Sequence, residues 1–366
     1  MHIPDGYLSP STCALLYGAA APFWCTAFAR VKRILNTRLV PLLAVASAFC
    51  FVIMMFNLPL PGGTTGHAVG VGAATVVLGP WASMLALSIA LLIQALLFGD
   101  GGITTLGANC FNMAIVGSLV AYVVYRLVAG GTSVGSSRRT LAAALAGYAA
   151  INSSAFVTAC ELGIQPMLFK DTGGAPLYAP YPLHIAIPAM MIGHLTFAGL
   201  AELIVSAGIV AYFQRTNPAL LNHNASRIPA NGEIETARQV PARSGWGGAG
   251  PLWIRLALLM MLTPLGILVA GTAWGEWSTR DFSNPEMRQK IAATSSNVAP
   301  PAQSPRGLER WSAVWSAPFP QYAPAFVHHP AFGYVISAMF GSGLIMGFFS
   351  CLNLIVNGRV IKRKSP

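Results

Sequence analysis

Long apolar runs separated by short polar stretches are the dominant pattern of the chain. A helix needs about 20 mostly apolar residues to cross a bilayer. Runs of adequate length occur at 11–29, 39–59, 82–98, 105–128, 140–162, 183–213, 253–274 and 334–356, and a shorter stretch rich in Gly and Ala occurs at 66–80. Strands of a membrane barrel would instead alternate apolar and polar residues. The pattern predicts an all-α, polytopic helical membrane protein with eight or nine transmembrane segments.

The composition agrees with this pattern and excludes several classes of protein. Of 366 residues, 54% are hydrophobic and 9% are charged, against ~25% charged residues in an ordinary globular protein. This excludes a water-soluble globule, a disordered tail protein and a disulfide scaffold. The net charge of +11 comes from short basic clusters between apolar runs, which is typical of membrane topology. We therefore expect a lipid bilayer around the chain and no nucleic-acid partner.

The basic clusters also predict an orientation. They lie at 30–38, 138–139, 215–243 and 359–364. If 66–80 counts as a crossing, all four fall on one face, which the positive-inside rule assigns to the cytoplasm. The N-terminus and the segments 60–67, 99–104 and 275–333 then lie outside, and the C-terminus lies in the cytoplasm. We expect a multi-pass protein of the inner or plasma membrane, with the crossing at 66–80 left open as a broken or re-entrant segment.

Three parts follow from the spacing of the apolar runs. Residues 214–252 are polar and rich in Pro, Gly and Arg, which indicates a cytoplasmic linker. It separates a membrane domain at 1–213, with about seven crossings, from a two-span extension at 253–366. The extension carries the external loop 275–333.

A candidate metal site lies at the start of the chain. Nothing there resembles a signal peptide, and His2 is too large for the initiator methionine to be removed, so we expect the chain to begin at Met1. The α-amine, the next amide and the His2 imidazole can chelate one divalent cation, and His67, expected on the same face, can complete four nitrogens. Planar nitrogen donors suit Ni(II), Cu(II) and Co(II). An ordinary turn with a solvated His67 is the alternative.

The loops around these residues have features that suit a ligand site. His67 lies in PGGTTGHAVG (61–70), where Gly62, Gly63 and Gly66 permit close approach of the backbone. Asp100 lies in the Gly-rich segment FGDGGITTLGAN (98–109), where we expect it to cap the following helix. Asn109 stands where it can bond across helices.

The chain lacks two motifs that would indicate bond-breaking chemistry. No GxxxxGK[ST] is present, so this chain holds no P-loop ATPase. No HExxH is present, which argues against a zincin-type protease. The residues indicate binding and passage of an ion, with no bound organic cofactor.

Several motifs together resemble one family. MHIPDGYLSP is similar to the N-terminal signature of the CbiM/NikM family, the substrate-capture (S) components of energy-coupling-factor cobalt and nickel transporters. PGGTTGHAVG, FGDGGITTLGANCFNMA (98–114) and PAMMIGHLTFAGLAE (188–202) resemble further motifs of that family in the same order. The segments TPLGILVAGTAWGEW (263–277) and PRGLERWSAVWSAPFPQYA (305–323) resemble the extension of long members, which is similar to the two-span CbiN or NikN subunit.

The resemblance implies a site, partners and a function. Met1, His2 and His67 would bind Co(II) or Ni(II) as the transported ion, with Asp5 folding the N-terminal segment onto the site. A membrane-embedded T component and paired cytoplasmic ATPases would drive import, and Glu202 is a possible contact with the T component. A separate accessory subunit stays open, as does the choice of metal. A membrane-bound metal-dependent enzyme and a non-transporting metal sensor are the alternative functions.

Overall fold

We analyse the chain in a computed structural model that describes residues 1–34, 39–60, 63–222, 250–269 and 271–362. The described residues are mostly helical, with one two-stranded sheet. The elements are α1 (Pro10–Ile34), α2 (Leu39–Met54), β1 (Leu58–Leu60), β2 (Thr64–Gly66), α3 (Val71–Leu78), α4 (Pro80–Ile93), η1 (Gln94–Phe98), α5 (Leu106–Asn109), η2 (Cys110–Val116), α6 (Gly117–Ala129), α7 (Ser137–Leu168), α8 (Leu183–Gly193), η3 (His194–Ala198), α9 (Gly199–Thr216), α10 (Ala219–Asn222), α11 (Gly250–Leu262), η4 (Thr263–Leu268), α12 (Pro285–Thr294), α13 (Arg306–Trp311), η5 (Pro320–Tyr322) and α14 (Pro330–Lys362).

Helices long enough to cross a membrane account for most of the fold. Within the described part of the chain, 7 helical stretches have the required length and composition, and the apolar helix α2 is shorter. The 7 stretches are Pro10–Lys32, Pro80–Phe98, Leu106–Ala129, Ser137–Leu168, Leu183–Thr216, Gly250–Leu268 and Pro330–Leu354. Seven of the eight long runs predicted from the sequence overlap one of these stretches, and the eighth run, 39–59, holds the shorter helix α2. The prediction of a polytopic helical membrane protein is therefore confirmed.

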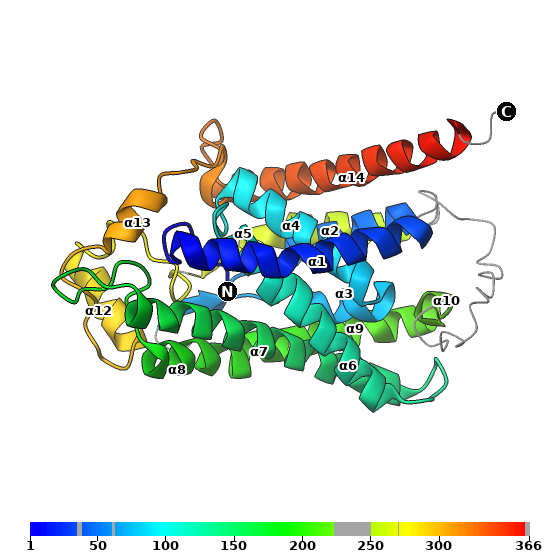
Figure 1. The fold of residues 1–366 in the computed structure, drawn as a ribbon. Coiled ribbons are helices and arrows are strands. Elements are labelled where there is room, and N and C mark those ends of the chain that lie inside the picture. The colour runs from blue at the N-terminus through cyan, green and yellow to red at the C-terminus, as the bar shows by residue number, and fades with distance from the viewer. Residues whose placement is uncertain (35–38, 61–62, 223–249, 270, 363–366) are drawn as a thin grey trace.

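The helices lie roughly side by side, so the bundle has two distinct ends (Figure 1). α12 and α13 gather at one end, and the C-terminus and the start of α7 lie at the other. Arg138 is in the first turn of α7 and Arg215 in the last turn of α9. Basic residues therefore mark the end that holds the C-terminus, as the positive-inside rule expects. Most of the predicted linker at 214–252 lies outside the described residues.

The predicted segment 66–80 is broken rather than one helix. β1 and β2 form an antiparallel hairpin in which Leu58 pairs with Gly66 and Leu60 with Thr64. The chain then passes His67 outside any helix or strand before α3 begins at Val71. α3 has 8 residues and is about 12 Å long, which is well short of a bilayer core of about 30 Å. His67 thus lies in the irregular stretch between a hairpin and a short helix.

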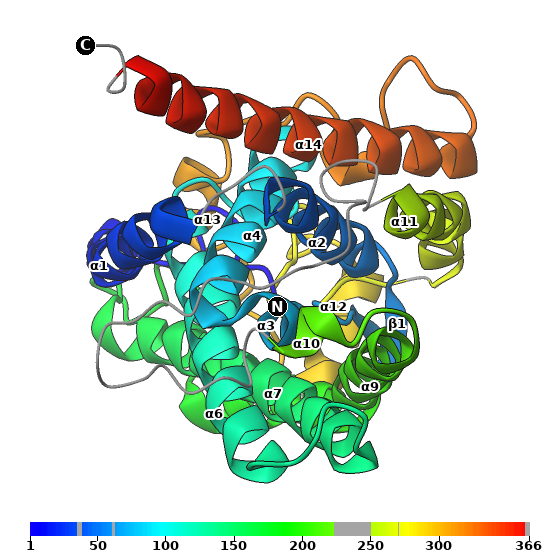
Figure 2. The ribbon, with the colours of Figure 1, turned by 90° about the vertical axis from the view of Figure 1, so that its right-hand side faces the viewer.

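The C-terminal extension packs along one side of the front bundle. α14 and α11 both contact α2, and Figure 2 shows α14 across the bundle with α11 beside α2. An aromatic stack joins the two parts: the ring of Tyr322, in η5, stacks on Phe98 with centroids 4.8 Å apart. Phe51 of α2 packs on Phe98 in turn, at 5.5 Å. The external part of the extension is therefore fixed to the front bundle.

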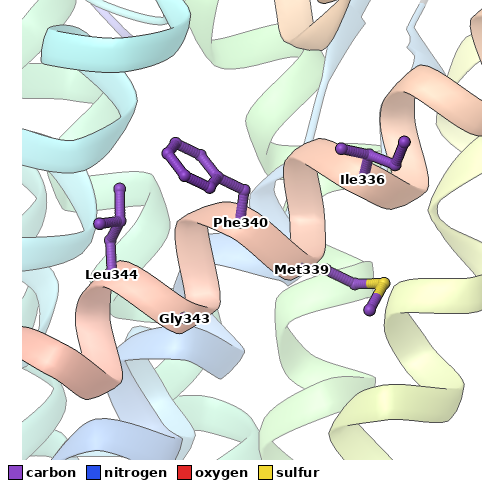
Figure 3. Close-up of a pocket in the computed structure, with 5 residues that line it drawn as sticks. All are labelled: Ile336, Met339, Phe340, Gly343 and Leu344. Carbon is purple, nitrogen blue, oxygen red and sulfur yellow. The ribbon is translucent and has the colours of Figure 1, made fainter. Parts of the chain in front are cut away.

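A shallow hollow on α14 has an entirely apolar lining. Figure 3 shows Phe340 and Leu344 on one side of the helix and Met339 on the other. Met339 is 59% exposed. Such a surface suits lipid chains and offers no ligand to a metal ion.

Candidate metal centre

The first residues of the chain are buried inside the bundle. Met1 is 3% exposed and His2 4%. The side chain of Asn109 makes two hydrogen bonds with the backbone of Ile3. The Ile3 amide donates to Asn109 Oδ1 at 2.8 Å, and Asn109 Nδ2 donates to the Ile3 carbonyl at 3.1 Å. Burying a charged chain end costs free energy unless it is paired. Asn109 therefore fixes the backbone at Ile3, and its role in shaping a metal site stays a prediction.

Asp5 ties this segment to the Gly-rich loop 98–109. Its carboxylate accepts hydrogen bonds from the Ile103 amide at 3.1 Å, from the Thr104 amide at 2.7 Å and from the Thr104 hydroxyl. The loop approaches so closely that a Cβ on Gly102 would lie 2.4 Å from the Asp5 nitrogen. A glycine is therefore required at Gly102. Asp5 holds the N-terminal segment in the way that the family resemblance implies.

The two histidines of the predicted site come together. The rings of His2 and His67 stack with centroids 5.0 Å apart and an angle of 27° between their planes. His67 Nδ1 lies 3.1 Å from the Ala68 carbonyl, and His67 is 6% exposed. His2 Nε2 is buried with no hydrogen-bond partner in the part of the chain that the structure describes. Two buried imidazoles in contact form a pair of nitrogen donors that a transition-metal ion could use.

Asp100 contacts this pair directly. Its Oδ1 lies 2.8 Å from His2 Nδ1, while its Oδ2 accepts from the Tyr322 hydroxyl at 2.6 Å and from Gln94 Nε2 at 3.3 Å. The expectation that Asp100 caps the following helix is wrong. The helix α5 has Thr105 at its N-cap position, and the carboxylate is directed to His2 instead. Asp100 therefore holds the ring nitrogen of His2 that a chelate with the His2 amide would need.

Electrostatics keep these groups in forms that suit metal binding. Burial lowers the pKa of the His67 imidazole well below its usual value, and the nearby His2 ring and α-amine lower it further. His67 is therefore neutral at physiological pH, with a lone pair available. Burial alone would raise the pKa of Asp100, but the adjacent His2 outweighs this and holds the pKa low. Asp100 thus stays ionised beside His2.

The glycines predicted around His67 have separate roles. Gly63 has φ of +83°, a left-handed conformation that favours glycine. A Cβ on Gly66 would lie 2.8 Å from Leu60 Cδ1 on the paired strand, so any side chain there would make the Leu60 side chain shift. Gly62 lies outside the described residues.

Side chains alone do not make a metal cluster here. Across residues 1–34, 39–60, 63–222, 250–269 and 271–362, no group of three or more His, Cys, Asp and Glu side chains could hold a metal ion. A nitrogen site at this place therefore needs the α-amine of Met1 and the backbone amide of His2, as the sequence predicts.

Glu202 lies inside the bundle, next to the segment that follows His67. Its side chain is fully buried. Its carboxylate accepts from the amides of Val69 and Gly70 at 2.8 Å and from that of Gly72 at 3.0 Å. These amides lie at the start of α3, and a carboxylate stabilises the first turn of a helix. Within this chain the side chain fixes the backbone after His67, and its contact with a T component stays a prediction.

A second buried glutamate, Glu161, bonds a side chain on another helix, whereas Glu202 bonds backbone amides. Asn112 Nδ2 donates to Glu161 Oε2 at 2.7 Å and so joins η2 to α7. This pair does not contact the segment that holds His67, and its role is the interhelical bond that buried polar residues make in membrane proteins.

The extension supplies two residues that sequence reasoning missed. The Met1 ammonium donates to Glu276 Oε1 at 3.4 Å, and Tyr322 donates to Asp100. Glu276 is 22% exposed. Their only sequence signal is their place in the segments 263–277 and 305–323 that resemble the extension of long family members. Neither motif indicates which residue reaches the site.

Comparisons with known proteins agree with this geometry. The family described as the cobalt uptake substrate-specific transmembrane region, CbiM, matches residues 2–220. The fused nickel transport protein NikMN of Rhodobacter capsulatus is 53% identical over 346 residues, which are 94% of this chain and 95% of that protein. The probable fused nickel transport protein LarMN of Lactiplantibacillus plantarum is 40% identical over 342 residues, 93% of each.

A solved structure shares part of the fold. A crystal structure described as that of a transition metal transporter is 49% identical, with a TM-score of 0.56. The match covers 59% of this chain and 93% of that chain.

Proposed function

The chain belongs to the CbiM family, and from this premise we propose that its buried N-terminal nitrogens capture Ni(II) or Co(II) for import across the membrane. It is a multi-pass membrane protein that transports a transition-metal ion. Relatives are named as nickel or cobalt transport proteins, which favours a transport subunit over an enzyme. The observation that carries the site is the stacked pair of buried imidazoles, His2 and His67, beside a buried chain terminus.

The proposed ligands are the Met1 amine, the His2 amide and imidazole, and His67. His67 Nδ1 lies in hydrogen-bond contact with the Ala68 carbonyl, which orients the ring. The other ring nitrogen, Nε2, is therefore the one that would bind the ion. In His2, Nδ1 closes a six-membered chelate ring with the amide nitrogen. Asp100, which holds that Nδ1 in the metal-free chain, is therefore the partner that the ion would displace.

Nickel is the better supported of the two ions. Four nitrogen donors in a plane suit Ni(II). The relatives that match this chain over more than 90% of both lengths carry nickel in their names. Over 80% of this chain, a relative named for cobalt is 33% identical.

ATP hydrolysis would come from other chains. The sequence holds no P-loop, and we propose that a membrane-embedded T component and paired cytoplasmic ATPases drive the cycle. The fused names of the relatives favour an extension that stands in place of a separate accessory subunit. Metal uptake that depends on co-expressed ATPases would separate a transporter from a sensor.

The N-terminal chelate can be tested with one added residue. We expect purified protein that begins at Met1 to bind one Ni(II), measured by calorimetry and metal analysis. One residue placed ahead of Met1 keeps every side chain but removes the amine from the chelate, and should abolish binding, as should His67→Ala. His184→Ala is the matched control, because His184 is exposed on α8. Unchanged binding in the two site variants would show that the metal binds elsewhere.

A further inference from the structure

A third buried imidazole, that of His194, has a ring nitrogen that the fold leaves unused. His194 is the first residue of η3 and is 3% exposed. Its Nδ1 lies 2.8 Å from the Met190 carbonyl. Its Nε2 is buried and has no hydrogen-bond partner among the residues that the structure describes. Buried polar atoms without a partner are rare in folded proteins, and each one calls for an explanation.

The contact with Met190 identifies the nitrogen of His194 that carries the hydrogen. A carbonyl oxygen only accepts, so Nδ1 is the donor. Burying the charged form of an imidazole costs more free energy than burying the neutral form, so Nε2 keeps a free lone pair. His67 has the same arrangement, with Nδ1 at 3.1 Å from the Ala68 carbonyl. A carbonyl on one ring nitrogen and a free lone pair on the other is the arrangement of a metal-binding histidine.

The helix that carries His194 packs on the hairpin formed by β1 and β2. A Cβ on Gly193 would lie 2.6 Å from Leu60 Cδ1, on β1. A Cβ on Gly66, at the end of β2, would lie 3.8 Å from the Ala198 Cβ. The His194 imidazole also interacts electrostatically with the N-terminal α-amine. The ring is therefore close to the segment before the proposed site and within electrostatic range of one proposed ligand atom.

His194 lies on the external side of the proposed site. Its helix starts at Leu183, at the end of the bundle that holds α12 and α13 (Figure 1), which the positive-inside rule assigns to the outside. Glu202 lies roughly 12 Å farther along the same helix, and it bonds the amide of Val69, just after His67. An ion that arrives from outside therefore reaches the depth of His194 first.

We propose that His194 Nε2 is a transit ligand, which binds the imported Ni(II) or Co(II) on the external side of the N-terminal chelate and then passes it to the chelate. This rests on the proposed function. An ion that leaves water gives up bound water molecules, and an imidazole on its route replaces one of them. A single imidazole holds the ion more weakly than four nitrogens do, so the ion moves on. Within the described ranges no group of three or more His, Cys, Asp and Glu side chains could hold a metal ion, which suits passage rather than storage.

A transit ligand changes the rates of binding and not the affinity. It does not contact the ion in the loaded site, so its removal raises the barrier to entry and the barrier to release equally. His194→Leu removes the nitrogen and keeps a buried side chain. We expect the rate constants for Ni(II) association and release each to fall by about tenfold, with Kd within about twofold of its original value. Stopped-flow absorbance measures association, and transfer to an excess of chelator measures release.

His184→Leu is the matched control, because it makes the same change at an exposed position on α8 of the same helical stretch. It should leave both rate constants unchanged. His194→Gln is a second variant, which keeps a polar side chain next to the hairpin. The glutamine amide is a poor ligand for Ni(II), so both rate constants should fall in this variant as well.

Three outcomes separate this role from others. Unchanged rate constants in both His194 variants would show that Nε2 takes no part in metal binding, and would overturn the proposal. Weaker affinity with faster release, or loss of the folded protein in both variants, would assign His194 a structural role and overturn it as well. Absence of Ni(II) and Co(II) binding to the unmodified chain would instead refute the proposed function.

Discussion

The front part of the chain and its extension meet at the proposed metal site with different chemistry. The front part brings nitrogen donors: the Met1 amine, His2 and His67. The extension brings oxygens, from Glu276 and Tyr322. Nitrogen donors suit Ni(II), whereas the two oxygens contact the Met1 amine and Asp100. The comparison predicts that substitutions in the front part change metal binding more than substitutions in the extension.

The membrane spans of the two parts overlap in how far they are buried within the chain. In the front part the buried share runs from 22% for Pro10–Lys32 to 61% for Pro80–Phe98, and the two extension spans are 22% and 39% buried. The contacts described between the extension and the proposed metal site come from the segment between these two spans. Single substitutions can break those contacts.

The largest effect is expected from removing the support behind His67. In the unmodified chain the two carboxylate oxygens of Glu202 accept hydrogen bonds from the amides of Val69, Gly70 and Gly72. Glu202→Gln leaves only one acceptor oxygen for these amides. Leaving a buried amide without a partner costs about 1–3 kcal/mol. We expect Ni(II) affinity to fall roughly tenfold to a hundredfold, measured by calorimetry.

Glu161→Gln is the matched control for this substitution. It makes the same change at a buried glutamate that bonds Asn112 and not the segment after His67. If both variants lose affinity equally, the loss reflects general damage to the bundle, and the positioning role of Glu202 is refuted.

Sequence reasoning found the nitrogens but not the groups that hold them. The apolar runs predict the helices because spanning a bilayer depends on local composition. Met1, His2 and His67 could be paired because chelation is local chemistry and the topology put both segments on one face. Asp100 was placed in the right loop but given the wrong role as a helix cap.

The missed contacts share a physical reason. Glu276 and Met1 are 275 residues apart, and Tyr322 and Asp100 are 222 apart. Glu202 bonds amides 130 or more residues away. Periodicity and spacing report only on neighbours within one element, so which loop packs against a distant carboxylate could not be read from them.

An intermediate effect is expected on the extension side. Tyr322→Phe removes the hydroxyl that donates to Asp100 at 2.6 Å but keeps the ring that stacks on Phe98. Asp100 keeps its contacts with His2 and Gln94. Without the hydroxyl, the Asp100 carboxylate should hold His2 Nδ1 more strongly, so we expect Ni(II) affinity to fall by about threefold to tenfold. This is less than the ~1.5–3 kcal/mol of a hydrogen bond to a charged group, because Asp100 keeps its other contacts.

Tyr334→Phe controls for the loss of a hydroxyl in the same aromatic cluster. The Tyr334 ring packs on that of Tyr322 with centroids 5.4 Å apart. An equal change in affinity in both variants would show that ring packing, and not the bond to Asp100, links the extension to the site.

The smallest effect is a pH dependence that belongs to the front part alone. Burial lowers the pKa of His67 well below 6.5 in the folded chain, whereas the unfolded chain titrates near that value. As pH falls through about 6.5, the unfolded state binds a proton that the folded state does not, so stability decreases. By pH 5.5 the metal-free protein should lose about 1.4 kcal/mol from this group.

Thermal unfolding of the metal-free protein at pH 7.5 and pH 5.5 measures this loss. Asp100 does not mask it, because the lowered pKa of that carboxyl gives a stabilisation that is complete above about pH 4 and constant in this range. His67→Gln cannot titrate and should remove part of the decrease in Tm. The same decrease in the variant would mean that His67 is not kept neutral by burial. The front part would then lose the property that distinguishes it from the extension: a nitrogen held ready for the ion before the ion arrives.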